Sequence, residues 1–156
     1  MPAVSEPAVA LPHTFRPRGV RIAAYFLGGL LLLVSTAIWF SLPPDVREQF
    51  TLFQRGTLIF FGVAACVAGQ ALARSQIQAS AGGATVVNGY KSRHYDWNEI
   101  VAITLGGGNP WAKLDLSDGT SVSAMGIQGS DGLRAMTQVK QVRALIRQQS
   151  RTDRDD

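Results

Sequence analysis

The chain has 156 residues, of which 46% are hydrophobic, and 15 basic and 11 acidic residues give it a net charge of +4. The charge is not concentrated in one domain, since residues 75–156 carry nine basic and eight acidic residues. A basic nucleic-acid-binding domain is therefore excluded. The single cysteine, Cys66, lies in an apolar run, which excludes an intramolecular disulfide and a cysteine-cluster metal site.

Residues 1–20 are rich in proline and small residues. They show no helical or strand periodicity and have too few apolar side chains to form a core. We expect a disordered tail here.

Two uncharged apolar runs follow, at 22–42 and 56–73. The first would form a helix of about 31 Å, which matches the hydrocarbon core of a bilayer. The second lies between Arg55 and Arg74, whose long side chains can reach the two membrane surfaces. The sequence predicts a transmembrane hairpin over 21–74, although a buried helix of a soluble protein remains an alternative for the second run.

The arginines favour one orientation of this hairpin. Arg16, Arg18 and Arg21 precede the first span, whereas only Arg47 and Arg55 belong to the connecting side. By the positive-inside rule, we expect both termini to be cytoplasmic. We also expect the protein to be a multi-pass protein of the plasma membrane.

Residues 75–150 contain turn signals that are typical of a small antiparallel β domain. Asn88-Gly89 predicts a two-residue hairpin turn in which both residues adopt positive φ. Around Asp118-Gly119, side-chain alternation favours a three-residue loop that pairs Leu114 with Val122 and Ala112 with Ala124. Gly119 would then occupy the left-handed bulge position.

The last part of the chain has helical periodicity. Ser130 or Asp131 can cap a helix whose apolar face follows steps of three and four residues: Leu133, Met136, Val139, Val142 and Ile146. Residues 151–156 contain no apolar side chain and are expected to fray.

Segments 83–88, 92–100 and 111–119 resemble the bacterial pleckstrin-homology-like (PH) domain, most clearly at Tyr95, Trp97 and Ile100. The closest likeness is the short version that small actinobacterial proteins carry beside two membrane helices, which lacks part of the full seven-stranded barrel. The resemblance implies an α+β fold, a small antiparallel β domain closed by a C-terminal amphipathic helix. It also implies a scaffold that binds phosphoinositides, peptides or proteins.

No residue pattern supports an enzyme, a cofactor or a metal site. Ser92, His94 and Asp96 share one strand face, but neighbours on such a face lie about 6.6 to 7 Å apart, too far for a hydrolytic triad. The only other histidine, His13, lies in the expected tail. The glycine-rich loop 106–110 precedes a strand and ends in proline, so it predicts a hairpin loop and not a phosphate cradle.

Lys91 and Arg93 are the candidate binding residues, because two basic side chains on one strand face can meet a phosphate or an acidic partner. An ordinary solvated strand is the alternative. We expect them on a tether of about 16 residues after Arg74, which would keep the domain near anionic lipid headgroups. Trp97 and Trp111 would form either an aromatic binding platform or, as we favour, core.

Two functions remain open. The first is a membrane-anchored, non-enzymatic interaction module that presents a β domain at the cytoplasmic face and binds a protein partner or anionic lipid headgroups. The second is an accessory subunit of a membrane complex, in which the hairpin contacts transmembrane partners through its small residues. These are Gly28, Gly29, Gly62, Ala64, Ala65 and Gly69, and they could equally pack the hairpin against itself.

Overall fold

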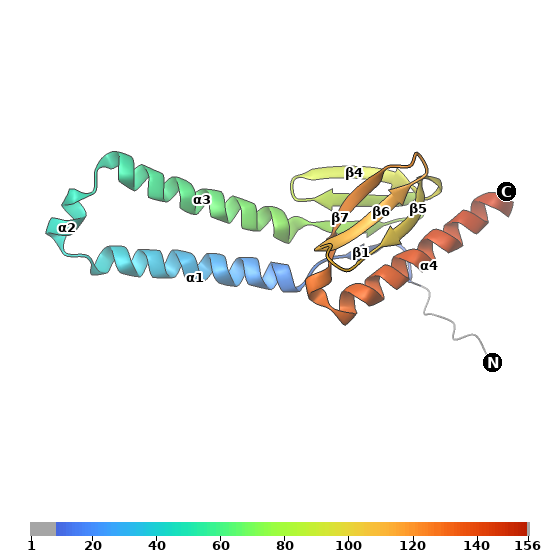
Figure 1. The fold of residues 1–156 in the computed structure, drawn as a ribbon, viewed down its shortest axis with the longest axis horizontal. Helices are drawn as coiled ribbons and strands as arrows, with labels where there is room; N and C mark the ends of the chain where they lie inside the picture. Colours follow the sequence, from blue (N-terminus) through green and yellow to red (C-terminus); the bar gives the residue numbers. More distant parts are fainter. Residues whose placement is uncertain (1–8, 156) are drawn as a thin grey trace.

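The computed structural model describes residues 9–155, which form two long helices side by side with a β domain at one end (Figure 1). Helices α1 (Gly19–Ser41) and α3 (Leu52–Arg74) have 23 residues each and are joined at the far end by the short helix α2 (Pro44–Gln49). Each long helix therefore spans about 34 Å. Ala73 is the only residue of these two helices that is buried.

Both long helices begin earlier than the hydropathy pattern predicts. Helix α3 starts at Leu52 because Thr51 and Gln54 form a capping box. In this box Thr51 Oγ1 accepts a hydrogen bond from the Gln54 amide at 3.3 Å, and Gln54 Oε1 accepts one from the Thr51 amide at 2.9 Å. Gln54 and Arg55 interrupt the apolar run, so hydropathy alone places the start at residue 56.

The first sheet has four antiparallel strands in the order β1-β2-β3-β4: β1 (His13–Phe15), β2 (Gln76–Ala79), β3 (Gly83–Asn88) and β4 (Lys91–Asp96). Strand β1 pairs with β2, where Phe15 lies opposite Ile77. The expectation of a disordered tail over residues 1–20 is therefore wrong from His13 onward, and residues 1–8 lie outside the described part. A three-residue strand is too short to show a periodicity.

The second sheet has the order β5-β6-β7 and contains β5 (Ile100–Thr104), β6 (Trp111–Leu116) and β7 (Ser121–Gln128). A 3-10 helix, η1 (Trp97–Glu99), connects it to the first sheet, and a second one, η2 (Gly129–Asp131), leads into helix α4 (Leu133–Asp155). The described strands thus number seven, contrary to the short barrel that we expected. The strand that we did not expect is β1, which the helix pair separates from β2 in the sequence.

The hairpin between β6 and β7 has the predicted register. Ala112 lies opposite Ala124 and Leu114 lies opposite Val122. Gly119 has a φ of +82°, and its amide donates to the Leu116 carbonyl at 3.0 Å. Hydrogen bonds from the Thr120 hydroxyl and amide to the Asp118 carboxylate lower the pKa of Asp118.

The hairpin between β3 and β4 is shifted by one residue from the prediction. Asn88 lies opposite Lys91, so the two loop residues are Gly89 and Tyr90. Gly89 has a φ of +62°, whereas the φ of Tyr90 is not positive. The predicted Asn-Gly turn would require a positive φ at both loop residues. Asn88 belongs to the strand, where its side chain has another role.

Helix α4 covers the sandwich with a face that only partly matches the predicted one. Val139, Val142 and Ile146 are buried as predicted, together with Ala135 and Leu145. Leu133 and Met136 were expected in this face, but they are 88% and 52% exposed. The helix also continues to Asp155, where we expected a frayed end over 151–156.

Candidate binding surfaces where the helix pair meets the β domain

Helix α3 passes into the β domain almost without a linker. Ser75 alone separates Arg74, the last residue of α3, from Gln76, the first residue of β2. The Ser75 hydroxyl donates to the Ala71 carbonyl at 3.3 Å and accepts a hydrogen bond from the Gly89 amide at 3.0 Å. The expected tether is therefore wrong, because the residues assigned to it form β2 and β3.

The tip of the β3–β4 hairpin packs against the last turns of α3. The Tyr90 hydroxyl donates to the Val67 carbonyl at 3.2 Å, and the Arg74 guanidinium lies 5.3 Å from the centre of the Tyr90 ring. A Cβ on Gly89 would lie 3.2 Å from the Ala71 Cβ. This close fit fixes the hairpin to α3.

The β domain also holds the start of α1. The Asp131 carboxylate in η2 accepts hydrogen bonds from the backbone amides of Arg18, at 3.0 Å, and Gly19, at 2.9 Å. These amides have no partner within the helix, and the carboxylate also complements the positive end of the helix dipole. The β domain is thus attached to both long helices.

Lys91 and Arg93 lie on the same face of β4, opposite Asn88 and Val86 of β3. Both are exposed. They border a groove of about 600 Å³ between β4 and β7, which is lined by Val86, Asn88, Lys91, Ser92, Arg93, Tyr95, Val122 and Ser123. The two candidate residues therefore share one concave surface.

Asn88 forms one wall of this groove and joins the two sheets. Its Nδ2 donates to the Ser123 carbonyl at 2.6 Å, and its Oδ1 accepts a hydrogen bond from the Met125 amide at 3.0 Å. The side-chain amide thus pairs with the backbone of β7 as a neighbouring strand would. Sequence reasoning missed this role because Asn before Gly is the usual signal of a turn.

A second cleft, of about 530 Å³, lies where the helix pair meets the first sheet, and we call it the arginine cleft. It is lined by Arg16, Arg21, Tyr25, Gln70, Ala73, Arg74, Gln76, Gln78, Val87, Gly89, Tyr90 and Ser92. Its sheet residues Gln76, Val87 and Ser92 alternate with the core residues Ile77 and Val86, so it lies on the outer face of the sheet. From the sequence alone, the three arginines of the cleft, Arg16, Arg21 and Arg74, indicate only the membrane topology of the helix pair.

Two of the polar residues of β4, His94 and Asp96, contact each other on the exposed face of the strand. His94 Nδ1 lies 2.9 Å from the Thr85 hydroxyl on β3, and His94 Nε2 lies 3.4 Å from Asp96 Oδ1. Ser92 instead lines the two clefts.

Trp97 belongs to the core, as predicted. It is 3% exposed, and its indole nitrogen donates to the Ser80 carbonyl at 2.9 Å. Trp111 is half-buried.

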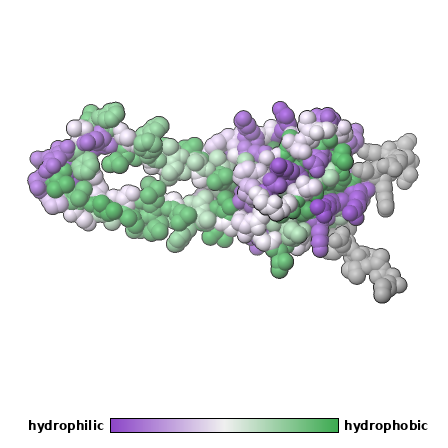
Figure 2. Space-filling view, in the orientation of Figure 1, coloured by the Kyte–Doolittle hydropathy of each residue, from purple (hydrophilic) through white to green (hydrophobic). Residues whose placement is uncertain are grey.

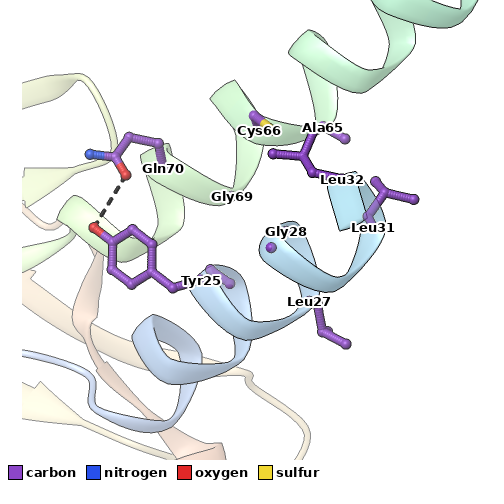
Figure 3. Close-up of a pocket in the computed structure, with 11 residues that line it drawn as sticks. Tyr25, Leu27, Gly28, Leu31, Leu32, Ala65, Cys66, Gly69 and Gln70 are labelled. Atoms are coloured by element: carbon purple, nitrogen blue, oxygen red, sulfur yellow. Dashed lines mark hydrogen bonds between the residues drawn. The ribbon is translucent and has the colours of Figure 1, made fainter. Parts of the chain in front are cut away.

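The two long helices contact each other near the β domain. Tyr25 donates to Gln70 Oε1 at 3.2 Å across the pair, at the end of a groove of about 410 Å³ that Figure 3 shows. A Cβ on Gly69 would lie 3.8 Å from Ala24, whereas one on Gly28 or Gly62 would meet nothing within 4 Å. Of these glycines, Gly69 is the one that packs the pair together.

Known proteins similar to this chain identify its family. A family model described as bacterial PH domain matches residues 74–145. Uncharacterised proteins of Mycobacterium tuberculosis strain H37Rv and Mycobacterium bovis are each 30% identical over 125 residues, covering 79% of this chain and 74% of the relative. No solved structure matches the chain significantly.

The similarity to these relatives is longer than the family match, so it includes residues beyond the β domain. The two antiparallel sheets and the closing C-terminal helix agree with the matched family. On this sequence match and this architecture, the chain belongs to the bacterial PH domain family.

Proposed function

We propose that this protein is a membrane-anchored, non-enzymatic interaction module that presents its PH-like β domain at the cytoplasmic face of the plasma membrane. The main support is the apolar surface of α1 and α3, whose length and composition suffice to cross a membrane. Phe53 is 82% exposed, and Phe40 and Ile59 are also exposed. A buried helix of a soluble protein would be covered by protein, whereas here lipid is the cover that fits.

The ends of the helix pair suit the two membrane surfaces. Figure 2 shows the apolar helices between a hydrophilic tip at α2 and the mixed surface of the β domain. At the far end the Arg55 guanidinium lies 5.5 Å from the centre of the Trp39 ring, and at the near end Arg74 stacks on Tyr90. Amphipathic aromatic rings and long basic side chains favour the membrane–water interface.

The charge distribution supports a cytoplasmic β domain. Arg16, Arg18 and Arg21 lie at the β-domain end of the pair, whereas the far end has two arginines, Arg47 and Arg55, together with two acidic residues, Asp45 and Glu48. Exposed Leu133 and Met136 at the start of α4 follow the η2 segment that holds α1, so the same surface can rest on the bilayer.

Within this function, the groove of Lys91 and Arg93 serves to recognise an acidic segment of a protein partner. Two exposed cations over a concave surface are complementary in charge to an acidic segment, and binding such a segment requires no catalytic residue. The domain is fixed to the helix pair, so these residues select a partner and are not needed for membrane attachment.

The test uses the full-length protein with the double change Lys91→Glu and Arg93→Glu. Both the wild type and this variant should stay in the membrane after alkaline carbonate extraction, because the helices anchor them. The variant should lose salt-sensitive partners that co-purify with the wild type. The matched control is Lys140→Glu with Arg147→Glu, two exposed cations on α4, and it should keep those partners.

Release of the wild type by carbonate would contradict membrane anchoring. Unchanged partners in the Lys91 and Arg93 variant would contradict the role of the groove.

The second candidate function is an accessory subunit whose helix pair contacts transmembrane partners. It is favoured by Gly28, Gly29 and Gly62, since a Cβ on any of them would meet nothing within 4 Å. Small residues on an open helix face permit close packing of another helix. Gly28→Leu with Gly62→Leu should then dissociate a native membrane complex while leaving the Lys91 and Arg93 partners bound.

A further inference from the structure

The arginine cleft gathers three cations from separate parts of the chain. Arg16 follows β1, Arg21 lies in the first turns of α1, and Arg74 ends α3. No acidic residue lines the cleft. Its walls instead add neutral hydrogen-bonding groups, namely Tyr25, Gln70, Gln76, Gln78, Tyr90 and Ser92.

The charges of these arginines are not neutralised by protein carboxylates in the described residues. The ion pair found there joins His94 to Asp96, and none involves Arg16, Arg21 or Arg74. Arg74 contacts the Tyr90 ring, which leaves its positive charge in place. Like charges gathered in one cleft repel each other, so an anion bound among them would be favoured.

The donors in the cleft suit the oxygen atoms of a phosphate. A guanidinium group donates two parallel hydrogen bonds to phosphate oxygens, which a lysine cannot do. Tyr25 donates to Gln70 Oε1, so the Gln70 side-chain nitrogen remains as a donor on the same wall. Gln76 and Ser92 can supply further donors from the sheet.

The position of the cleft relates its ligand to the membrane. Tyr25 and Gln70 lie within the two apolar helices, Arg21 and Arg74 lie near their ends, and Gln78 lies on the sheet. The cleft therefore extends across the proposed interface between the bilayer and the cytoplasm. Lipid phosphate groups lie at this level.

We propose that the arginine cleft binds a phosphate anion supplied by the headgroup of an anionic lipid. The site is separate from the groove of Lys91 and Arg93, which lies on the inner side of the same sheet. Arg16 and Arg21 lie outside the 74–145 family match, so the isolated domain lacks two of the three cations. The lipid source rests on the proposed membrane insertion of α1 and α3.

The experiment uses the full-length protein in neutral detergent micelles and titrates phosphatidylglycerol or phosphatidylcholine. Binding is read as the rise in melting temperature and as lipid retained in native mass spectrometry. The test variant carries Arg16→Gln, Arg21→Gln and Arg74→Gln. The control carries Lys113→Gln, Lys140→Gln and Arg147→Gln, which removes the same charge outside the cleft.

We expect the wild type and the control to bind phosphatidylglycerol in preference to phosphatidylcholine. The test variant should bind it about 100-fold more weakly, since each interfacial cation contributes about a fivefold effect. An Arg-to-Lys variant at the same three positions should recover only part of the affinity, because it keeps the charge and loses the paired donors.

A further arm with inorganic phosphate identifies the source of the anion. Displacement of bound phosphatidylglycerol by millimolar phosphate would place the phosphate group in the cleft and identify a free anion as a competing ligand. Equal lipid binding by the test variant and the wild type would overturn the proposal. Membrane insertion is checked separately by carbonate extraction of both proteins, so failure of the anchor and failure of the cleft are distinguishable.

Discussion

Gly19 at the start of α1 fits directly against Asp131 of the β domain. The Gly19 amide donates to Asp131 Oδ1 at 2.9 Å, and a Cβ on Gly19 would lie 2.7 Å from the same oxygen. Gly19 thus leaves the space into which a distant carboxylate reaches to cap the helix, and a Cβ at this position would push the Asp131 carboxylate away. This contact and the packing of Tyr90 on α3 join the β domain to both helices.

The first prediction follows from this contact. Gly19→Ala and Asp131→Ala should each lower the free energy of unfolding by about 1–2 kcal/mol, because the cap is displaced or removed. Thermal unfolding of the full-length protein in detergent measures the change. Gly29→Ala is the matched control in the same helix, since its Cβ meets nothing within 4 Å. An unchanged melting temperature for Asp131→Ala would show that the cap contributes nothing.

The second prediction concerns strand β1. Phe15 is 1% exposed in the core although it precedes both long helices in the chain. Phe15→Ala should cost about 3–5 kcal/mol of stability, whereas Thr14→Ala, on an exposed neighbour, should cost little. Chemical denaturation of the full-length protein distinguishes the two variants.

A fragment of residues 76–150 gives an independent test of β1. This fragment contains both hairpins and most of helix α4, but it lacks β1, one strand of the first sheet. The fragment should be largely unfolded, and residues 9–17 joined to it by a flexible linker should restore a β-rich circular dichroism spectrum. A fully folded fragment without them would mean that β1 is dispensable.

The third prediction uses Trp97 to test the core. Trp97→Ala should destabilise the protein by about 3–5 kcal/mol, because it leaves a large cavity. Trp97→Phe should cost less, with about 1 kcal/mol from the lost hydrogen bond to the Ser80 carbonyl. A near-neutral Trp97→Ala would instead indicate an exposed binding platform.

The fourth prediction concerns the link between the sheets through Asn88. Asn88→Ala removes the acceptor of the Met125 amide and the donor to the Ser123 carbonyl. We expect a loss of about 1–3 kcal/mol, since two backbone groups lose their partner. Hydrogen exchange of the Met125 amide should accelerate in this variant and stay unchanged in Asn98→Ala, a change at an exposed residue. Unchanged exchange in both would show that the bridge is absent in solution.

Local signals in the sequence predicted much of the fold. The register of the β6–β7 hairpin followed from side-chain alternation, because a slip would place Leu114 on the wrong face. The two long helices followed from length and hydropathy. The position of Trp97 followed from the need of a small domain for large core side chains.

Features that depend on distant contacts could not be predicted. Strand β1 exists because Phe15 pairs opposite Ile77, a partner on the other side of the helix pair. The β3–β4 turn shifted because Asn88 bonds to β7. The arginine cleft was missed for the same reason, since Arg16 and Arg74 come together only in the folded chain.

The central claim is that the helix pair spans the membrane and holds the β domain on the cytoplasmic side. It is tested most directly by single cysteines at Glu48 in α2 and at Asp118 in the β6–β7 turn, introduced after Cys66→Ser. A membrane-impermeant thiol reagent is then applied to intact and to permeabilised cells. The account predicts that the cysteine at residue 48 reacts in intact cells and that the one at residue 118 reacts only after permeabilisation. Reaction of both cysteines only after permeabilisation, or of residue 118 in intact cells, would contradict it.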